Sequence, residues 1–173
     1  EMCIRDRWEA VVGDPETRKA MKAKALAKAQ TEARAAMAKN WIAENGVLTG
    51  AADGGTIGSA KNYENFELIL DWKTEGEAAM GIRSIPQIAL GGKNSGALTG
   101  NMLHDNAAPK AAANGPQEWN TMQVKVVSDR VTVVLNGVTT AENVILENAC
   151  NREIPAYAEG PVSYTHLRAH ETL

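Results

Sequence analysis

Alternation of apolar and polar residues is clearest in three segments of the chain. In Phe66–Trp72 every even position is large and apolar, and the odd positions carry two acids and an isoleucine. Thr121–Val127 and Arg130–Leu135 alternate in the same way, and a second turn follows at Asn136–Gly137. A period of two is typical of a strand with one buried face. These segments therefore predict antiparallel strands, the last two joined in a meander.

Shorter apolar segments separated by turn residues predict further strands. Asn45–Gly46 is a strong turn dipeptide between Trp41–Ile42 and Val47–Leu48. Met80–Arg83 and Gln87–Leu90 are expected to be two strand pieces with a bend between them. A further short strand is predicted at residues 143–146. The long stretch from 91 to 115 is expected to line a site, because a compact domain rarely keeps so long a loop without a function.

A helical period replaces this alternation near the start. Asp14 and Pro15 are a suitable N-cap and first helical residue, and helix-forming residues continue from there to Asn40. The apolar positions fall on one thin stripe at helical spacing, formed by Leu26, Ala29, Ala33, Met37 and Trp41. The fold class we expect is mainly β: an antiparallel β-sandwich with strands over about 41–160 and one helical insertion over about 15–40.

Composition narrows the function classes. Of the 173 residues 44% are hydrophobic and 23% are charged, as in globular proteins. The net charge of −3 offers no basic field for nucleic acid. No run of about 18 apolar residues is present, so we expect no membrane span.

The two ends of the chain resemble a sequencing-library adapter. Possible coding sequences for residues 1–7 and 161–167 are reverse complements of each other over nearly their whole length. We therefore expect residues 1–7 and 161–173 to be artefacts, and we restrict the fold prediction to residues 8–160. The exclusion removes Cys3, His166 and His170, so Cys150 has no disulfide partner and no histidine pair is available for a metal.

Several motifs, taken in order, resemble the 3-keto-disaccharide hydrolase domain family. The matching segments are Gly13–Pro15, Asn65–Trp72, Gly81–Gln87, Glu118–Asn120, Asp129–Gly137 and Asn143–Asn148. The resemblance implies a concanavalin-like jelly roll, in agreement with the strand pattern. In the family the chain starts before the position of Trp8 and continues past that of Gly160 into two more strands. The sandwich is accordingly expected to be incomplete, and the chain unstable or prone to aggregate.

The resemblance also implies cleavage of glycosides already oxidised at C3 of the sugar. The C3 ketone acidifies the C2 proton, so a general base can remove it and the group on C1 can leave by elimination. For catalysis we single out Arg83, as a contact for the developing oxyanion, and Asp71, as a possible base. Substrate-binding candidates are Gln87, Glu67, Asn101, Trp119 and Asn120. Alternation is expected to place Arg83, Gln87 and Asp71 together on the face opposite the core.

Each of these residues also has a purely structural or solvent-exposed interpretation. The carboxylates and Arg83 suit a solvated surface with ion pairs, and Trp119 suits packing under a loop. His104 suits an ordinary solvated loop histidine. No cofactor is predicted, although a divalent metal held by Asp, Glu and His remains an alternative.

The sequence also departs from the family. Where the family often has a glutamine, an aromatic residue and an acid, this chain has Ala89–Gly92; Thr99 stands where a tyrosine is usual. A non-catalytic carbohydrate-binding sandwich is therefore the alternative function, with a purely structural domain as a third. An oxidised glycoside is the partner expected, and the family implies a periplasmic or extracellular address.

Overall fold

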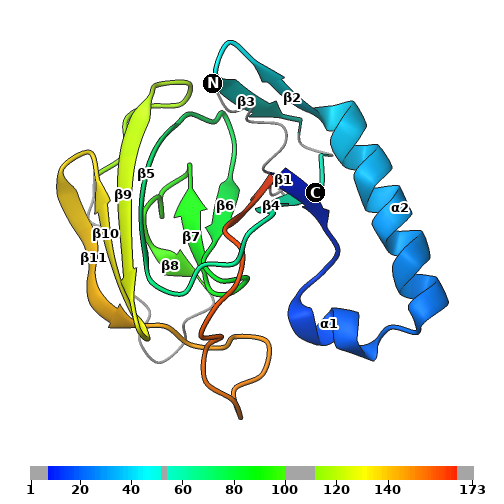
Figure 1. Cartoon of the computed structure of the whole chain (residues 1–173). Coiled ribbons are helices and arrows are strands. Elements are labelled where there is room, and N and C mark those ends of the chain that lie inside the picture. The colour runs from blue at the N-terminus through cyan, green and yellow to red at the C-terminus, as the bar shows by residue number, and fades with distance from the viewer. Residues whose placement is uncertain (1–7, 52–53, 100–111, 167–173) are drawn as a thin grey trace, which may run out of the picture.

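Two antiparallel sheets pack face to face in the computed structural model, which describes residues 8–51, 54–99 and 112–166 (Figure 1). One sheet has four strands in the order β11 (Val138–Ile145), β10 (Arg130–Leu135), β9 (Asn120–Val127) and β5 (Phe66–Trp72). The other has six, in the order β1 (Trp8–Val11), β4 (Thr56–Ser59), β12 (Ser163–His166), β6 (Ala78–Gly81), β7 (Gln87–Leu90) and β8 (Leu98–Thr99). The predicted antiparallel sandwich is confirmed.

The four-stranded sheet follows the predicted alternation closely. Its β9 strand buries every second residue, including Met122, Val124 and Val126, which are fully shielded from solvent. In β5 the odd positions are exposed, and Trp72 ends the strand inside the core. The turn at Asn136–Gly137 has positive φ at both residues, as the tight hairpin turns that match strand twist require. The segment predicted as a separate strand at 143–146 belongs mostly to β11.

The six-stranded sheet supplies the other half of the core. Met80, Ile88 and Leu98 are opposite one another in the strand register and pack against the four-stranded sheet. The following register row, Gly58–Ser163–Gly81–Gln87–Thr99, therefore lies on the outer face of this sheet.

The strand β12 corrects the expected end of the folded chain at Gly160. Residues 163–166 lie between β4 and β6, in the middle of the six-stranded sheet. Val162 and Tyr164 fit because they alternate with Ser163 and Thr165 and place their side chains in the core. The Tyr164 ring also packs against Trp8, at 5.2 Å between centroids, and burial raises the pKa of its hydroxyl. The exclusion of residues 161–166 from the fold was wrong, whereas the adapter origin of both ends stays a prediction.

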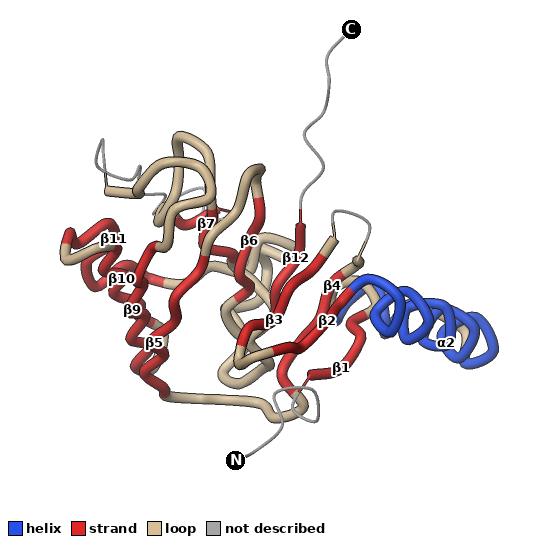
Figure 2. The backbone as a smooth tube through the Cα atoms, turned by 90° about the horizontal axis from the view of Figure 1, so that it is seen from above, coloured by secondary structure: helices blue, strands red, loops and turns tan. Residues whose placement is uncertain are grey.

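The predicted helix over 15–40 is two helices. The break falls at Met21 and Lys22, whose backbones are extended, between α1 (Pro15–Ala20) and α2 (Ala23–Asn40). The two helices have different neighbours. In α1, the Arg18 guanidinium donates to the carbonyls of Val12 and Gly13. The helix α2 lies along β1, at the edge of the six-stranded sheet (Figure 2). In the described ranges no helix is long and apolar enough to cross a membrane.

The predicted hairpin around Asn45–Gly46 is formed by β2 (Trp41–Glu44) and β3 (Val47–Gly50). Trp41 is buried, and its indole Nε1 donates to the Gly54 carbonyl at 2.9 Å. A Cβ on Gly50 would lie 2.7 Å from the Trp41 ring, so glycine is required for the ring to lie across the hairpin. The predicted stripe of α2 is confirmed, since Leu26, Ala29, Ala33 and Met37 are half-buried.

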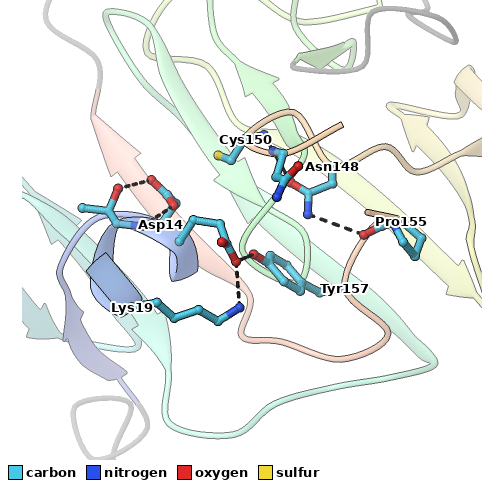
Figure 3. A network of polar contacts seen from close by, with 9 residues as sticks. Asp14, Lys19, Asn148, Cys150, Pro155 and Tyr157 are labelled. Carbon is cyan, nitrogen blue, oxygen red and sulfur yellow. Dashed lines mark hydrogen bonds and ion pairs between the residues drawn. The ribbon is translucent and has the colours of Figure 1, made fainter. Parts of the chain in front are cut away.

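A network of polar contacts fastens α1 to the segment between β11 and β12 (Figure 3). Asp14 caps α1, because its carboxylate accepts from the Thr17 hydroxyl at 2.6 Å and from the Thr17 backbone N–H at 2.9 Å. These two hydrogen bonds lower the pKa of the Asp14 carboxyl. Tyr157 Oη donates to Glu16 Oε1 at 3.0 Å, and Lys19 Nζ lies 2.7 Å from the same oxygen. Glu16 and Tyr157, which are 141 positions apart in the sequence, are thus joined by a hydrogen bond.

Candidate functional site

A pocket of about 240 Å³ lies where three connections of the sandwich meet. It is bounded by the turn after β5, the β7–β8 connection and the segment that precedes β9. Its polar side chains come from Trp72, Thr74, Glu75, Lys93, Ser95, Asn114 and Asn120. We call this the loop-end pocket.

Close backbone approach brings two of these connections together. Gly91 has a φ of +78°, and a Cβ there would lie 2.2 Å from the Gly76 carbonyl oxygen and 2.6 Å from the Thr74 side chain. Only glycine tolerates both the conformation and the contact. Gly91 therefore has a steric role in this chain.

The third connection is held in place by Asn120, which is buried at the start of β9. Its Oδ1 accepts from the Asn114 backbone N–H at 2.8 Å and from Asn136 Nδ2 at 2.9 Å, and its Nδ2 donates to the Glu118 carbonyl at 3.0 Å. Its side-chain amide is thus engaged within the protein. Asn120 fixes the loop that carries Trp119, as a positioning residue in the pocket wall.

Trp119 presents its indole beside this loop and is 49% exposed. The Lys73 ammonium lies 5.0 Å from the centroid of the Trp119 ring, within the range of a cation–π contact. The segment of Trp119 also supplies Pro116 and Asn120 to the pocket lining, so an exposed aromatic surface lies in the chain between two lining residues.

Charged and neutral polar groups line the pocket. Glu75 is exposed there, and Gln117 Nε2 donates to its Oε1. Lys93 extends from the β7–β8 connection, and Ser95 Oγ donates to the Gly92 carbonyl at 3.1 Å. One carboxylate, one ammonium, an indole and amides offer both acceptors and donors to a ligand rich in hydroxyl groups.

The predicted catalytic pair is not brought together. Asp71 is exposed on the outer face of the four-stranded sheet, where its Oδ1 accepts from Thr121 Oγ1 at 2.6 Å. Glu67 is exposed on the same face, opposite Lys125 in the register. Asp71 and Trp72 are consecutive in a strand, so their side chains leave opposite sides of the sheet and only Trp72 reaches the loop-end pocket.

Arg83 is in a turn and not on a strand, since β6 ends at Gly81. It is 3% exposed, and its guanidinium donates to the carbonyls of Glu64 and Tyr157. Burial lowers the pKa of the Arg83 guanidinium. Arg83 therefore connects the segment before β5 to the segment between β11 and β12.

Gln87 is half-buried on the outer face of the six-stranded sheet, and Asn101 lies outside the described residues. The prediction that Arg83, Gln87 and Asp71 share one face is wrong, because Asp71 and Gln87 belong to different sheets. The stretch 91–115 contributes Lys93 and Asn114, from its described ends, to the lining of the loop-end pocket, and its role in a site stays a prediction.

Sequence reasoning missed Trp72, Glu75, Lys93 and Asn114. A signal was present, because Lys73–Gly76 is a polar turn at the end of the clearest strand and 91–95 is a second glycine-rich turn. The proximity of these two turns depends on which strands are neighbours in the sheets, and the pattern along a single strand does not reveal that. Across the described ranges no cluster of three or more His, Cys, Asp or Glu side chains is placed to hold a metal.

Comparison with known proteins relates the fold of this chain to a carbohydrate-related family. A family model described as a 3-keto-alpha-glucoside-1,2-lyase-like domain matches residues 6–171. No curated protein matches the chain by sequence.

Solved structures share the fold at low identity. A "putative glycosyl hydrolase" from Parabacteroides distasonis is 21% identical with a TM-score of 0.59, over 76% of this chain and 84% of its own. A second protein of that description from the same organism is 19% identical with a TM-score of 0.56, over 73% and 76%. The carbohydrate-binding module CBM66 from Bacillus subtilis is 15% identical with a TM-score of 0.51, over 72% and 81%.

Proposed function

Because the chain belongs to the 3-keto-alpha-glucoside-1,2-lyase-like domain family, we propose that it cleaves 3-keto-glycosides in the loop-end pocket. The substrate arrives already oxidised at C3, so the reaction needs no hydride acceptor. The C3 ketone makes the C2 proton acidic enough for a carboxylate to remove. We also propose the location that the family implies, which is periplasmic or extracellular.

The observation that carries the proposal is the charge arrangement of the loop-end pocket. Among its described lining residues, Glu75 supplies the carboxylate and Lys93 the ammonium. Glycosidases that pass through an oxocarbenium-like state use two carboxylates around the bond they cleave. One carboxylate and one cation lining the same pocket suit abstraction of a proton next to a carbonyl, with stabilisation of the oxyanion that results.

The electron flow assigns a role to each group. Glu75 accepts the C2 proton, the C2–H electrons form a C2=C3 double bond, and the carbonyl electrons move onto the C3 oxygen. Lys93 supplies positive charge near that oxyanion. When the C3 carbonyl forms again, a C1=C2 double bond develops and the bond from C1 to the leaving oxygen breaks. The proton held by Glu75 then passes to the departing oxygen.

Glu75 takes the base role in place of Asp71, and no catalytic role is given to Arg83. Asp71 lies on the opposite side of β5 from the pocket, and the Arg83 guanidinium is occupied by two backbone carbonyls. Trp119 supplies an exposed stacking surface for the keto sugar ring. Asn120 keeps that surface in position through its bonds to residues 114 and 118.

The test is an assay of the purified chain with methyl 3-keto-α-glucoside, following the ultraviolet absorbance of the enone product and the release of methanol. The proposal predicts turnover of the keto sugar and none of methyl α-glucoside, whose C2 proton is not acidic. Saturable binding without turnover would favour the alternative function, a non-catalytic carbohydrate-binding domain. Neither binding nor turnover would overturn both.

A further inference from the structure

The strand β5 ends the four-stranded sheet and has β9 as its neighbour on one side (Figure 2). The direction of its backbone groups follows from Thr121, whose carbonyl accepts from the Asn136 N–H at 2.9 Å and so points away from β5. Asp71 is opposite Thr121, and opposite residues of an antiparallel pair either exchange hydrogen bonds or both point away. The backbone groups of Asp71, and by alternation those of Glu67 and Ile69, are therefore directed outwards. Among the described residues these outward N–H and C=O groups have no partner.

The side chains at this edge are also incompletely covered. On β9 the core-facing residues are fully shielded from solvent, whereas their opposite residues on β5 are only half-buried, namely Phe66, Leu68 and Leu70. On the outer face Ile69 is 63% exposed in the middle of the strand. A further strand laid along β5 would cover these side chains together with the outward backbone groups.

The other ends of the two sheets are less suited to pairing. The strand β8 has two residues, β11 shifts its register against β10, and β1 lies along α2. The strand β5 has seven residues without glycine or proline, in unbroken register with β9. A long, regular and apolar edge strand is the kind that pairs with a strand of another chain.

We propose that β5 pairs antiparallel with β5 of a second copy of this chain, about a twofold axis at Leu70. Pairing extends the strand by one residue and places Glu67 opposite Lys73 of the second copy, twice because of the symmetry. On the core side Leu70 meets Leu70 of the second copy, and Leu68 meets Trp72. The four-stranded sheets of the two copies then form one continuous sheet.

Charge selects this axis from its neighbours. An axis at Ile69 would place Glu67 opposite Asp71 of the second copy, and like charges directly opposite each other are destabilising. An axis at Leu68 would place Glu67 opposite Ile69 and Asp71 opposite Asn65, so neither acid would face a cation. A twofold contact also uses the same edge of both copies, so growth stops at the dimer.

Sedimentation velocity between about 1 and 100 μM tests the proposal, which does not depend on the proposed function. The wild-type chain is expected to show a monomer–dimer equilibrium. Glu67→Lys and Lys73→Glu each create two like-charge pairs and are expected to raise the dissociation constant at least about tenfold. The double variant Glu67→Lys/Lys73→Glu restores both pairs and is expected to return to within about threefold of wild type. Glu32→Lys on α2, with the same change in net charge as Glu67→Lys, is expected to dimerise as wild type does.

Ile69→Pro tests the backbone part of the contact. Proline removes an N–H that points away from β9, so the bonds between β5 and β9 stay intact and the variant is expected to fold as a monomer. Ile69→Thr keeps that N–H and is expected to dimerise. A wild-type chain that is monomeric at the highest concentration, or that assembles beyond the dimer, would overturn the proposal. So would a double variant as weak as the single ones, and this comparison decides if Ile69→Pro does not fold.

Discussion

Lys73 places its ammonium 5.0 Å from the centre of the Trp119 ring. The contact joins the turn after β5 to the loop before β9. The cation occupies one side of an indole that is otherwise half exposed, so a ligand that stacks on Trp119 uses the remaining side or displaces Lys73. Trp119 is thereby contacted by a cation and stays 49% exposed.

We expect Trp119→Ala to raise the KM for methyl 3-keto-α-glucoside about tenfold and to leave kcat within about twofold. The stacking surface is worth about 1.4 kcal/mol, which corresponds to a factor of ten in affinity. Steady-state kinetics measure both constants. Lys73→Gln is the matched control, because it keeps the ring, and its KM should stay within about twofold. An unchanged KM in Trp119→Ala would remove Trp119 from the site.

Glu75→Gln is expected to lower kcat at least about 100-fold, because an amide of the same shape cannot accept the C2 proton. Sugar binding should persist, since the amide keeps an oxygen at the same place. Asp71→Asn is the matched control on the outer face of the four-stranded sheet and should retain full turnover. The reverse outcome, an active Glu75→Gln and an inactive Asp71→Asn, would restore Asp71 as the base.

Arg83→Met is expected to lower the free energy of unfolding by about 2–3 kcal/mol, because two carbonyls that accept from the guanidinium lose their donor. Arg83→Lys should lose nearly as much, since one ammonium lacks the planar fork that serves two acceptors. Urea denaturation measures the change, and the folded fraction of each variant should keep the wild-type kcat. A stable but inactive Arg83→Lys would point to the catalytic role first predicted for Arg83.

The alternation of apolar and polar residues was sufficient to predict the sandwich, because a strand with one buried face needs an apolar residue at every second position. Met122, Val124 and Val126 face the core as their spacing requires, and Asn136–Gly137 forms the expected turn. The site was less accessible to this reasoning. The segments of Glu75, Lys93 and Asn114 are neighbours only because β5 pairs with β9 in one sheet and β6 with β7 in the other.

The corrections have the same physical origin. Alternation tells which residues share a face of one strand, but it does not tell which sheet the strand joins, and so Asp71 and Gln87 were grouped wrongly. Arg83 continues an apolar segment in the sequence, yet the strand stops at Gly81 and the chain turns. The position of β12 between β4 and β6 is likewise set by pairing partners far away in sequence.

The contact between Tyr157 and Glu16 is expected to make stability depend on pH. Lys19 and the Tyr157 hydroxyl lower the pKa of the Glu16 carboxyl, and burial and the Glu16 bond raise the pKa of Tyr157. A lowered carboxyl pKa adds stability above its ordinary value of 4.5, which is lost as the pH falls through the lowered value. A raised tyrosine pKa adds stability below its ordinary value of 10.0, which is lost as the pH rises through the raised value.

Tyr157→Phe should therefore melt on the order of 2 °C below the wild-type protein at pH 7, and the difference should shrink in acid and at strongly alkaline pH. Thermal unfolding followed by circular dichroism between pH 3 and pH 11 measures it. Tyr63→Phe, which alters an exposed tyrosine elsewhere, is the control. A difference in Tm that stays constant over the whole range would show that the hydroxyl acts independently of Glu16.

Exchange of the C2 proton tests the assignment of the loop-end pocket most directly. Methyl 3-keto-α-glucoside is incubated with the protein in D₂O, and proton NMR follows the C2–H signal together with the released methanol. Glu75 as the base predicts that the wild-type protein and Asp71→Asn remove the C2 proton, with deuterium entering any sugar that returns from the enediolate, whereas Glu75→Gln leaves the signal at the rate seen without protein. Equal loss of the C2–H signal in wild type and Glu75→Gln would contradict it.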